Sequence, residues 1–221
     1  METLFHKPIE VSVGHGQYIR GELTIPESCE ALVIFSHGSG SSRFSPRNRK
    51  VASDLHAQHF ATLLIDLLTP EEDREYRNRF DIDLLAERLI RVTSFVAIEP
   101  ELGSCPIGYF GASTGAASAL KAAAKLGTMI EAVVSRGGRP DLAEEALVKV
   151  NAPVLLIVGS LDPDVITLNR KAFALLPGER ELVIVEGASH LFEEEGKLDE
   201  VAHLAGDWFT KFLAAHPITA H

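Results

Sequence analysis

The sequence predicts an α/β protein of three layers, in which a mostly parallel sheet lies between two layers of helices. Short apolar runs, typical of strands buried on both faces, alternate with stretches of helical periodicity along the whole chain. This alternation is typical of a parallel sheet whose crossover connections are right-handed. The 221 residues, of which 46% are hydrophobic, fit one domain of this size. We therefore expect a single domain over residues 1–221.

The expected elements follow one another in order. An antiparallel hairpin covers about residues 8–26, because the segment 14–17, Gly-His-Gly-Gln, separates two alternating stretches. The later strands are expected at 31–36, 61–67, 106–111, 130–135, 153–159 and 181–187. The helices are expected at 46–59, from Phe80, after Ser113, from Asp141, from Pro163, and along the final apolar stripe of Val201, Leu204, Trp208 and Phe212. Residues 68–79 are expected to form a polar loop, and the tail 215–221 is expected to be flexible.

Composition excludes several classes of function. Lys and Arg number 21 against 31 Asp and Glu, and a net charge of −10 argues against a nucleic-acid partner. The chain has neither a secretory signal pattern nor an apolar run long enough to cross a membrane, so we expect no membrane partner and a cytoplasmic location. Cys29 and Cys105 are expected to be reduced thiols. The histidines are scattered and no cofactor fingerprint is complete, so we expect neither a metal nor a cofactor.

Candidate catalytic residues follow three different strands of the expected sheet. In such sheets, ligands bind at the carboxyl ends of the strands. Ser113, Asp162 and His190 lie at such ends, in this chain order. The segment 111–115, Gly-Ala-Ser-Thr-Gly, matches the G-x-S-x-G nucleophile elbow, whose glycines make room for a strained turn between a strand and a helix.

These residues predict nucleophilic catalysis. Ser113 would attack an acyl carbon, His190 would accept and return its proton, and Asp162 would hold the imidazole. We expect an oxyanion hole made by the backbone N–H groups of Ser39 and Thr114. Asp162 could instead only cap the helix that starts with Pro163, in which case Asp164 would be the alternative acid.

The chain resembles the dienelactone hydrolase family of the α/β-hydrolase fold from about Ala31 to Phe212. The resemblance rests on the segments 36–42 (SHGSGSS), 111–115 (GASTG), 159–162 (GSLD) and 187–190 (GASH). The segments 45–49 (SPRNR) and 135–141 (SRGGRPD) resemble a compact subgroup, which in some genomes is fused to a phosphoribosyltransferase-like domain; we expect no such domain here. Dienelactone hydrolases proper use a cysteine nucleophile, and Ser113 at that position favours a serine esterase.

The resulting hypothesis is a serine hydrolase that cleaves a small soluble ester, thioester or lactone. Only a few residues separate Ser135 from Asp141, so a separate lid domain is not expected and the site should be open or shallow. The alternatives are an acyltransferase on the same triad and a non-catalytic module that binds a ligand or a partner. The sequence does not indicate an oligomeric state.

Arginines near the strand ends raise a question about the charge of the substrate. Arg43, Arg136 and Arg139 could bind an anionic substrate. They could equally form salt bridges with acidic residues of neighbouring loops. Both alternatives stay open from the sequence.

Overall fold

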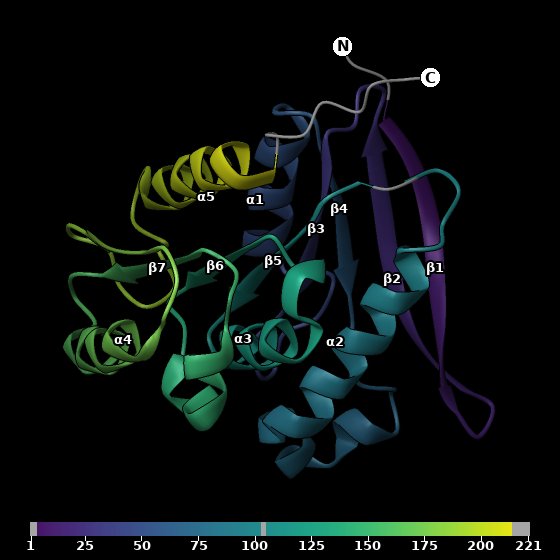
Figure 1. The fold of residues 1–221 in the computed structure, drawn as a ribbon, viewed down its shortest axis with the longest axis horizontal. Coiled ribbons are helices and arrows are strands. Elements are labelled where there is room, and N and C mark those ends of the chain that lie inside the picture. The colour runs from purple at the N-terminus through teal and green to yellow at the C-terminus, as the bar shows by residue number, and fades with distance from the viewer. Residues whose placement is uncertain (1–3, 103–104, 214–221) are drawn as a thin grey trace.

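A computed structural model describes residues 4–102 and 105–213, and these form a sheet covered by helices on both faces (Figure 1). Within the described residues the sheet has eight strands in the order β1-β2-β4-β3-β5-β6-β7-β8. The pairs β1–β2 and β2–β4 are antiparallel and all the others are parallel. The strands are β1 (Leu4–Gly14), β2 (Gln17–Pro26), β3 (Ala31–Ser36), β4 (Phe60–Ile65), β5 (Ile107–Ala112), β6 (Ala132–Arg136), β7 (Val154–Gly159) and β8 (Arg180–Val185). The predicted three-layer, mostly parallel fold with an N-terminal antiparallel hairpin is confirmed.

The hairpin is longer than the sequence predicts. Its first strand pairs from Leu4, opposite Pro26, so the predicted start near residue 8 is wrong. Most side chains of residues 4–8 are exposed, and the apolar alternation that marks the strand begins only at Ile9. The connection is a two-residue turn in which His15 and Gly16 have positive φ angles of 50° and 71°. The expected flexible tail, 215–221, lies outside the described residues.

The helices divide into two groups around the sheet (Figure 1). Helices α1 (Pro46–His56) and α5 (Lys197–Leu213) cover one face, where Phe35 and Phe110 stack with ring centroids 4.9 Å apart. Helices α2 (Ile82–Val96), α3 (Thr114–Leu126) and α4 (Pro163–Leu175) cover the other face. The small side chains of α3, mostly alanines, let this helix approach the sheet closely, and this holds its N-terminus behind Ser113.

Three segments differ from the predicted elements. The helix expected from Asp141 is a 3₁₀ segment, η4 (Pro140–Lys149), which Glu144 interrupts at a φ of 40°. Helix α1 ends at His56 rather than near residue 59. The expected polar loop 68–79 contains the short 3₁₀ helices η1 (Glu72–Arg74) and η2 (Tyr76–Phe80). These helices are held by ion pairs, which periodicity does not detect.

The parallel strands end along one edge of the sheet, and this edge carries the functional segments. The residues that follow β3, β5, β6, β7 and β8 meet there, because parallel strands present their carboxyl ends together. Among the described helices, none combines the length and the apolar character needed to span a bilayer.

Candidate active site

Ser113 lies in a strained turn between β5 and α3. Its φ of 52° and ψ of −122° are unusual for a residue with a side chain, and such strain is typical of functional turns. Two backbone hydrogen bonds, to the end of β6 and to the segment after it, hold the turn. The N–H of Ser113 donates to the carbonyl of Arg136 at 3.2 Å, and the N–H of Arg139 donates to the carbonyl of Ser113 at 3.0 Å. The nucleophile candidate is therefore fixed by the turn that follows β6.

The two glycines of the motif are required by close backbone contacts. A Cβ atom on Gly115 would lie 2.1 Å from the carbonyl oxygen of Ser36. A Cβ atom on Gly111 would lie 2.5 Å from the Cα of Ala116. Backbone atoms cannot move aside as a flexible side chain can, so larger residues at either position would displace β3 or α3. This is the geometry that the G-x-S-x-G spacing predicts.

Asp162 and His190 form a direct pair. The Nδ1 atom of His190 lies 2.6 Å from Oδ2 of Asp162, which follows β7. Asp162 also precedes α4, but its carboxylate makes no capping hydrogen bond to that helix. Asp164, the alternative acid, is exposed. The local capping pattern therefore does not account for the Asp162 side chain, which is directed to the histidine.

The loop that carries His190 is held by a hydrogen bond to Glu194 and by close packing against Gly137. The carboxylate of Glu194 accepts a hydrogen bond from the N–H of Ser189 at 3.1 Å. A Cβ atom on Gly137 would lie 3.0 Å from the carbonyl oxygen of His190 and 3.6 Å from its Cε1 atom. Because residues on both sides of Gly137 hydrogen-bond to Ser113, this turn links the histidine to the serine. The structure gives no hydrogen bond between the Ser113 hydroxyl and the His190 ring, although it describes both residues.

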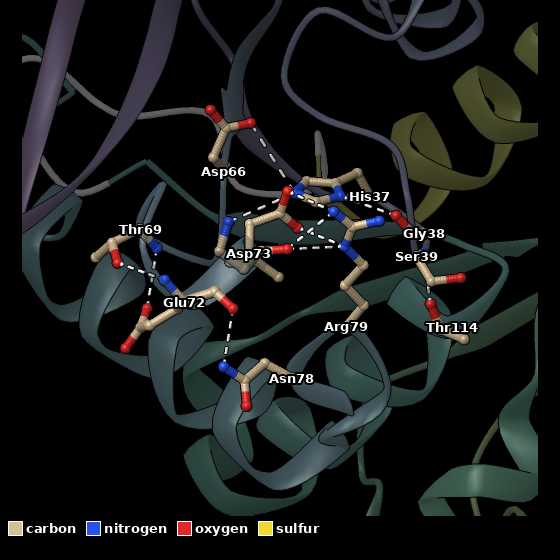
Figure 2. Close-up of polar contacts among 11 residues, drawn as sticks. His37, Gly38, Ser39, Asp66, Thr69, Glu72, Asp73, Asn78, Arg79 and Thr114 are labelled. Atoms are coloured by element: carbon tan, nitrogen blue, oxygen red, sulfur yellow. Dashed lines mark hydrogen bonds and ion pairs between the residues drawn. The ribbon is translucent and has the colours of Figure 1, made fainter. Parts of the chain in front are cut away.

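The segment after β3 passes directly against Ser113. A Cβ atom on Gly38 would lie 3.0 Å from the Cβ of Ser113. The N–H of Ser39 donates a 2.8 Å hydrogen bond to the hydroxyl of Thr114, and Figure 2 shows the two residues beside Gly38. One of the two expected oxyanion donors is therefore already engaged. The other, the N–H of Thr114, begins helix α3, where backbone N–H groups have no partner within the helix.

His37 holds this segment in place. Its Nδ1 atom lies 3.0 Å from the carbonyl oxygen of Gly38, and its Nε2 atom accepts a 3.4 Å hydrogen bond from the N–H of Leu67. Both bonds are satisfied by a neutral ring that carries its proton on Nδ1. Figure 2 shows the ring next to Asp66, whose carboxylate lies 4.0 Å from Nε2. His37 thus acts as a connection between the ends of β3 and β4.

The three arginines have different surroundings. Arg43 pairs with Asp66, to which it donates from both its backbone and its side chain. Arg139 makes two hydrogen bonds of 2.8 Å to its neighbour Asp141. Arg136 is buried, and among the described residues it pairs with no carboxylate. Arg43 and Arg139 therefore form salt bridges, which is one of the two alternatives that the sequence leaves open. Of the three arginines, Arg136 alone has no carboxylate partner among the described residues.

A cavity of about 270 Å³ lies next to the segment after β3. The side chains that line it include Tyr18, His37, Ser42, Arg43, Leu68 and Asp73. Ion pairs hold its outer wall, since Arg79 binds Asp73 at 2.9 Å (Figure 2). In the described ranges 4–102 and 105–213, no group of three or more His, Cys, Asp or Glu side chains is placed to hold a metal ion.

The two cysteines lie close together, away from the elbow. Their Sγ atoms are 3.8 Å apart and both thiols are free. The hydrogen bond from Cys105 lowers the pKa of Cys29 to about 7, and the same contact raises the pKa of Cys105. By its lowered pKa, Cys29 is therefore the more reactive of the two thiols. It does not lie at the nucleophile elbow, where Ser113 lies.

Some functional features were not predicted from the sequence. The G-x-S-x-G motif assigns a role to the backbone N–H of Thr114 but none to its hydroxyl, which accepts the N–H of Ser39. Glu194 belongs to an acidic run that is typical of a solvated turn, yet its carboxylate binds the backbone of the histidine loop. The Thr114 contact joins segments far apart in the chain, which spacing does not reveal. The Glu194 contact is local, because Ser189 lies five residues earlier.

The fold and the strand-end placement of these residues define an α/β-hydrolase. No family model matches the chain. Among solved structures, a dienelactone hydrolase from Anabaena variabilis is 50% identical, with a TM-score of 0.92, and the match covers 95% of this chain and 99% of that one. The chain belongs to the dienelactone hydrolase family. Est1E from Butyrivibrio proteoclasticus has the same fold at 17% identity, with a TM-score of 0.78 and coverage of 92% and 98% of the two chains.

Two curated proteins from Mycobacterium tuberculosis strains are similar to this chain but are not named as hydrolases. Both are provisionally named phosphoribosyl transferases, and both are 57% identical to this chain over 195 residues. The match covers 88% of this chain but only 44% of each of those proteins. The chain thus spans less than half the length of these relatives.

Proposed function

We propose that this protein is a serine hydrolase that cleaves a small soluble carboxylic ester, thioester or lactone through an acyl-enzyme intermediate. The observation that carries the proposal is the 2.6 Å contact between Asp162 and His190 at the sheet edge where Ser113 occupies its strained turn. These three residue types, in this order after their strands, are those of the Ser-Asp-His triad of α/β-hydrolases. The likeness to hydrolases supports the reaction class.

The reaction would begin with attack of the Ser113 hydroxyl oxygen on the carbonyl carbon. The ring of His190 accepts the hydroxyl proton as the new bond forms, and Asp162 stabilises the resulting imidazolium and fixes its orientation. Collapse of the tetrahedral intermediate breaks the bond to the alcohol, thiol or lactone oxygen, which takes the proton from His190. Water, activated by the same histidine, then releases the acyl group and restores Ser113.

The oxyanion formed in these steps would be stabilised mainly by Thr114. Its backbone N–H lies at the start of α3, where the helix dipole favours negative charge. Its hydroxyl oxygen accepts the N–H of Ser39, so its proton is free to be donated to the oxyanion. Ser39 then acts by orienting that hydroxyl.

Replacing Thr114 with valine is expected to lower kcat roughly 10²-fold to 10³-fold while KM changes little. Valine keeps the shape of threonine but removes the hydroxyl donor. Ester hydrolysis by the purified variant measures the effect, and Thr114→Ser, which restores a hydroxyl, is expected to recover most of the rate. If Thr114→Val is as fast as the original protein, the freed N–H of Ser39 would be the direct donor and the assignment to the hydroxyl would be wrong.

The short connection after β6 favours short, soluble acyl groups. Only residues 137–139 separate β6 from η4, so this connection adds no lid over Ser113 that could enclose a long alkyl chain. In a series of 4-nitrophenyl esters we expect kcat/KM to be highest for chains of about two to four carbons and to fall at least about tenfold by eight carbons. Rates that rise with chain length up to the long fatty acyl esters would contradict a small-substrate hydrolase.

The acidic net charge and the free thiols support a cytoplasmic protein without a nucleic-acid or membrane partner. We do not propose phosphoribosyl transfer for this chain, because most of the length of the mycobacterial relatives lies outside the match. Acyl transfer to an alcohol would use the same three residues and would be detected as an ester product when alcohol competes with water. Failure of all esters to react would favour a binding module.

A further inference from the structure

Arg136 is a buried cation that no carboxylate among the described residues neutralises. It ends β6 and is 6% exposed. Among the described residues, its side chain makes one hydrogen bond, a long one of 3.4 Å from Nη2 to the amide oxygen of Asn48, and its Nε atom has no partner. Burying an unpaired charge costs several kcal/mol unless other groups compensate. A buried arginine without such compensation therefore points to a negatively charged group that binds there.

A second arginine shares the neighbours of Arg136. Arg47 precedes Asn48, whose amide oxygen accepts from Arg136, and it pairs with Glu193, which follows Phe192. Arg47 lies in the first turn of α1, and its own Nε atom is also buried without a partner. Burial and the positive charge of Arg47 lower the pKa of Arg136 to about 10, so the Arg136 side chain remains protonated at neutral pH. The carboxylate of Glu193 accepts a 2.7 Å hydrogen bond from Arg47, but its side chain is 61% exposed and is free to move into water.

The arginine pair lies between the elements that carry the nucleophile and the base. The carbonyl of Arg136 binds the N–H of Ser113, and the ring of Phe192 lies 5.9 Å from its guanidinium carbon. Phe192 and Glu193 follow His190 by two and three residues. A group bound by Arg136 and Arg47 would therefore lie at the end of β6, which pairs with the strand that leads into Ser113, and beside the loop that carries His190.

We propose that Arg136 and Arg47 form a subsite for a phosphate group carried by the substrate. Two adjacent guanidinium groups match the double charge and the several acceptor oxygens of a phosphate better than a single carboxylate. The N-terminal turn of α1, to which Arg47 belongs, adds a favourable dipole. Binding would displace Glu193 from Arg47 and give the Nε donors their missing partner. The assignment to a substrate rests on the proposed hydrolase function, whereas the phosphate site itself does not.

Titration calorimetry with inorganic phosphate at constant ionic strength tests the subsite. The original protein and the matched control Arg49→Gln are expected to bind phosphate with similar affinity, because Arg49 lies on the same helix but pairs with Glu22. Arg47→Gln is expected to bind at least tenfold more weakly, and Arg136→Gln, if its circular dichroism is unchanged, should lose binding. Acetate should bind at least tenfold more weakly than phosphate.

Several results would overturn the proposal. These are no phosphate binding by the original protein, equal binding by Arg47→Gln and Arg49→Gln, or acetate binding as tight as that of phosphate. Phosphate should also compete with a neutral 4-nitrophenyl ester, and binding without competition would separate the subsite from the substrate. Because calorimetry needs no turnover, the two proposals fail separately. Ser113→Ala, which removes the nucleophile, should still bind phosphate, and an original protein that hydrolyses the neutral ester but binds no phosphate would overturn the subsite alone.

Discussion

Replacing Ser113 with alanine is expected to lower kcat for a short 4-nitrophenyl ester by a factor on the order of 10⁶. The reason is that the acyl-enzyme cannot form without the hydroxyl, and the remaining groups accelerate attack by water only weakly. The fold should not change, since the strained turn is held by backbone hydrogen bonds to Arg136 and Arg139. Steady-state and burst kinetics on the purified variant measure the effect.

The matched control removes the rival nucleophile. Cys29 has the lowered thiol pKa, of about 7, but lies in the pair with Cys105. Cys29→Ala is therefore expected to keep its activity within about twofold, because the thiol is not part of the triad. If Cys29→Ala loses activity and Ser113→Ala retains it, the nucleophile would be the cysteine and the proposed mechanism would fail.

Replacing Asp162 with asparagine is expected to lower kcat by about 10⁴-fold with a small change in KM. The amide keeps the shape of the side chain but can no longer stabilise the imidazolium that His190 becomes. It also favours the wrong tautomer, because the 2.6 Å contact to Nδ1 requires an acceptor. A pH profile of kcat distinguishes this effect from unfolding, because activity should partly recover at high pH if hydroxide replaces the activated water.

Asp164 provides the control for this variant. It lies two residues further along the chain, in the same first turn of α4, and it is exposed. Asp164→Asn is expected to change kcat less than about twofold, since surface substitutions without a partner have small effects. A large loss in Asp164→Asn together with an active Asp162→Asn would exchange the two assignments.

Most of the fold could be predicted from sequence because its signals are local. The six parallel strands are apolar runs, and five of them are buried throughout, so their periodicity and length identify them within one or two residues. The start of β1 could not be predicted, because the side chains of residues 4–6 are exposed and carry no burial pattern. The helix expected from Asp141 is η4 instead, because the positive φ at Glu144 depends on the packing of that turn.

In the candidate site, too, local features could be predicted from sequence and features that depend on distant residues could not. The role of the two glycines of the elbow could be predicted from sequence, because the steric clash that they avoid lies within the motif and the adjacent strand. The direction of the Asp162 side chain was ambiguous, since an Asp-Pro pair also begins a helix, and only the partner across the chain resolves it. The three arginines also differ. Arg43 and Arg139 each pair with a carboxylate of a neighbouring loop or turn, and Arg136 does not. The Arg43–Asp66 pair depends on a tertiary distance that spacing does not contain, whereas the Arg139–Asp141 pair is local.

The central claim, that Ser113 is an activated nucleophile, is tested most directly by a fluorophosphonate probe. This reagent reacts with serine hydroxyl groups that an adjacent base activates, so it reports the nucleophile without knowledge of the substrate. The account predicts one covalent adduct per chain on the original protein, located by peptide mass spectrometry on Ser113 and absent from Ser113→Ala. Labelling that persists in Ser113→Ala, or that maps to another residue, would contradict it.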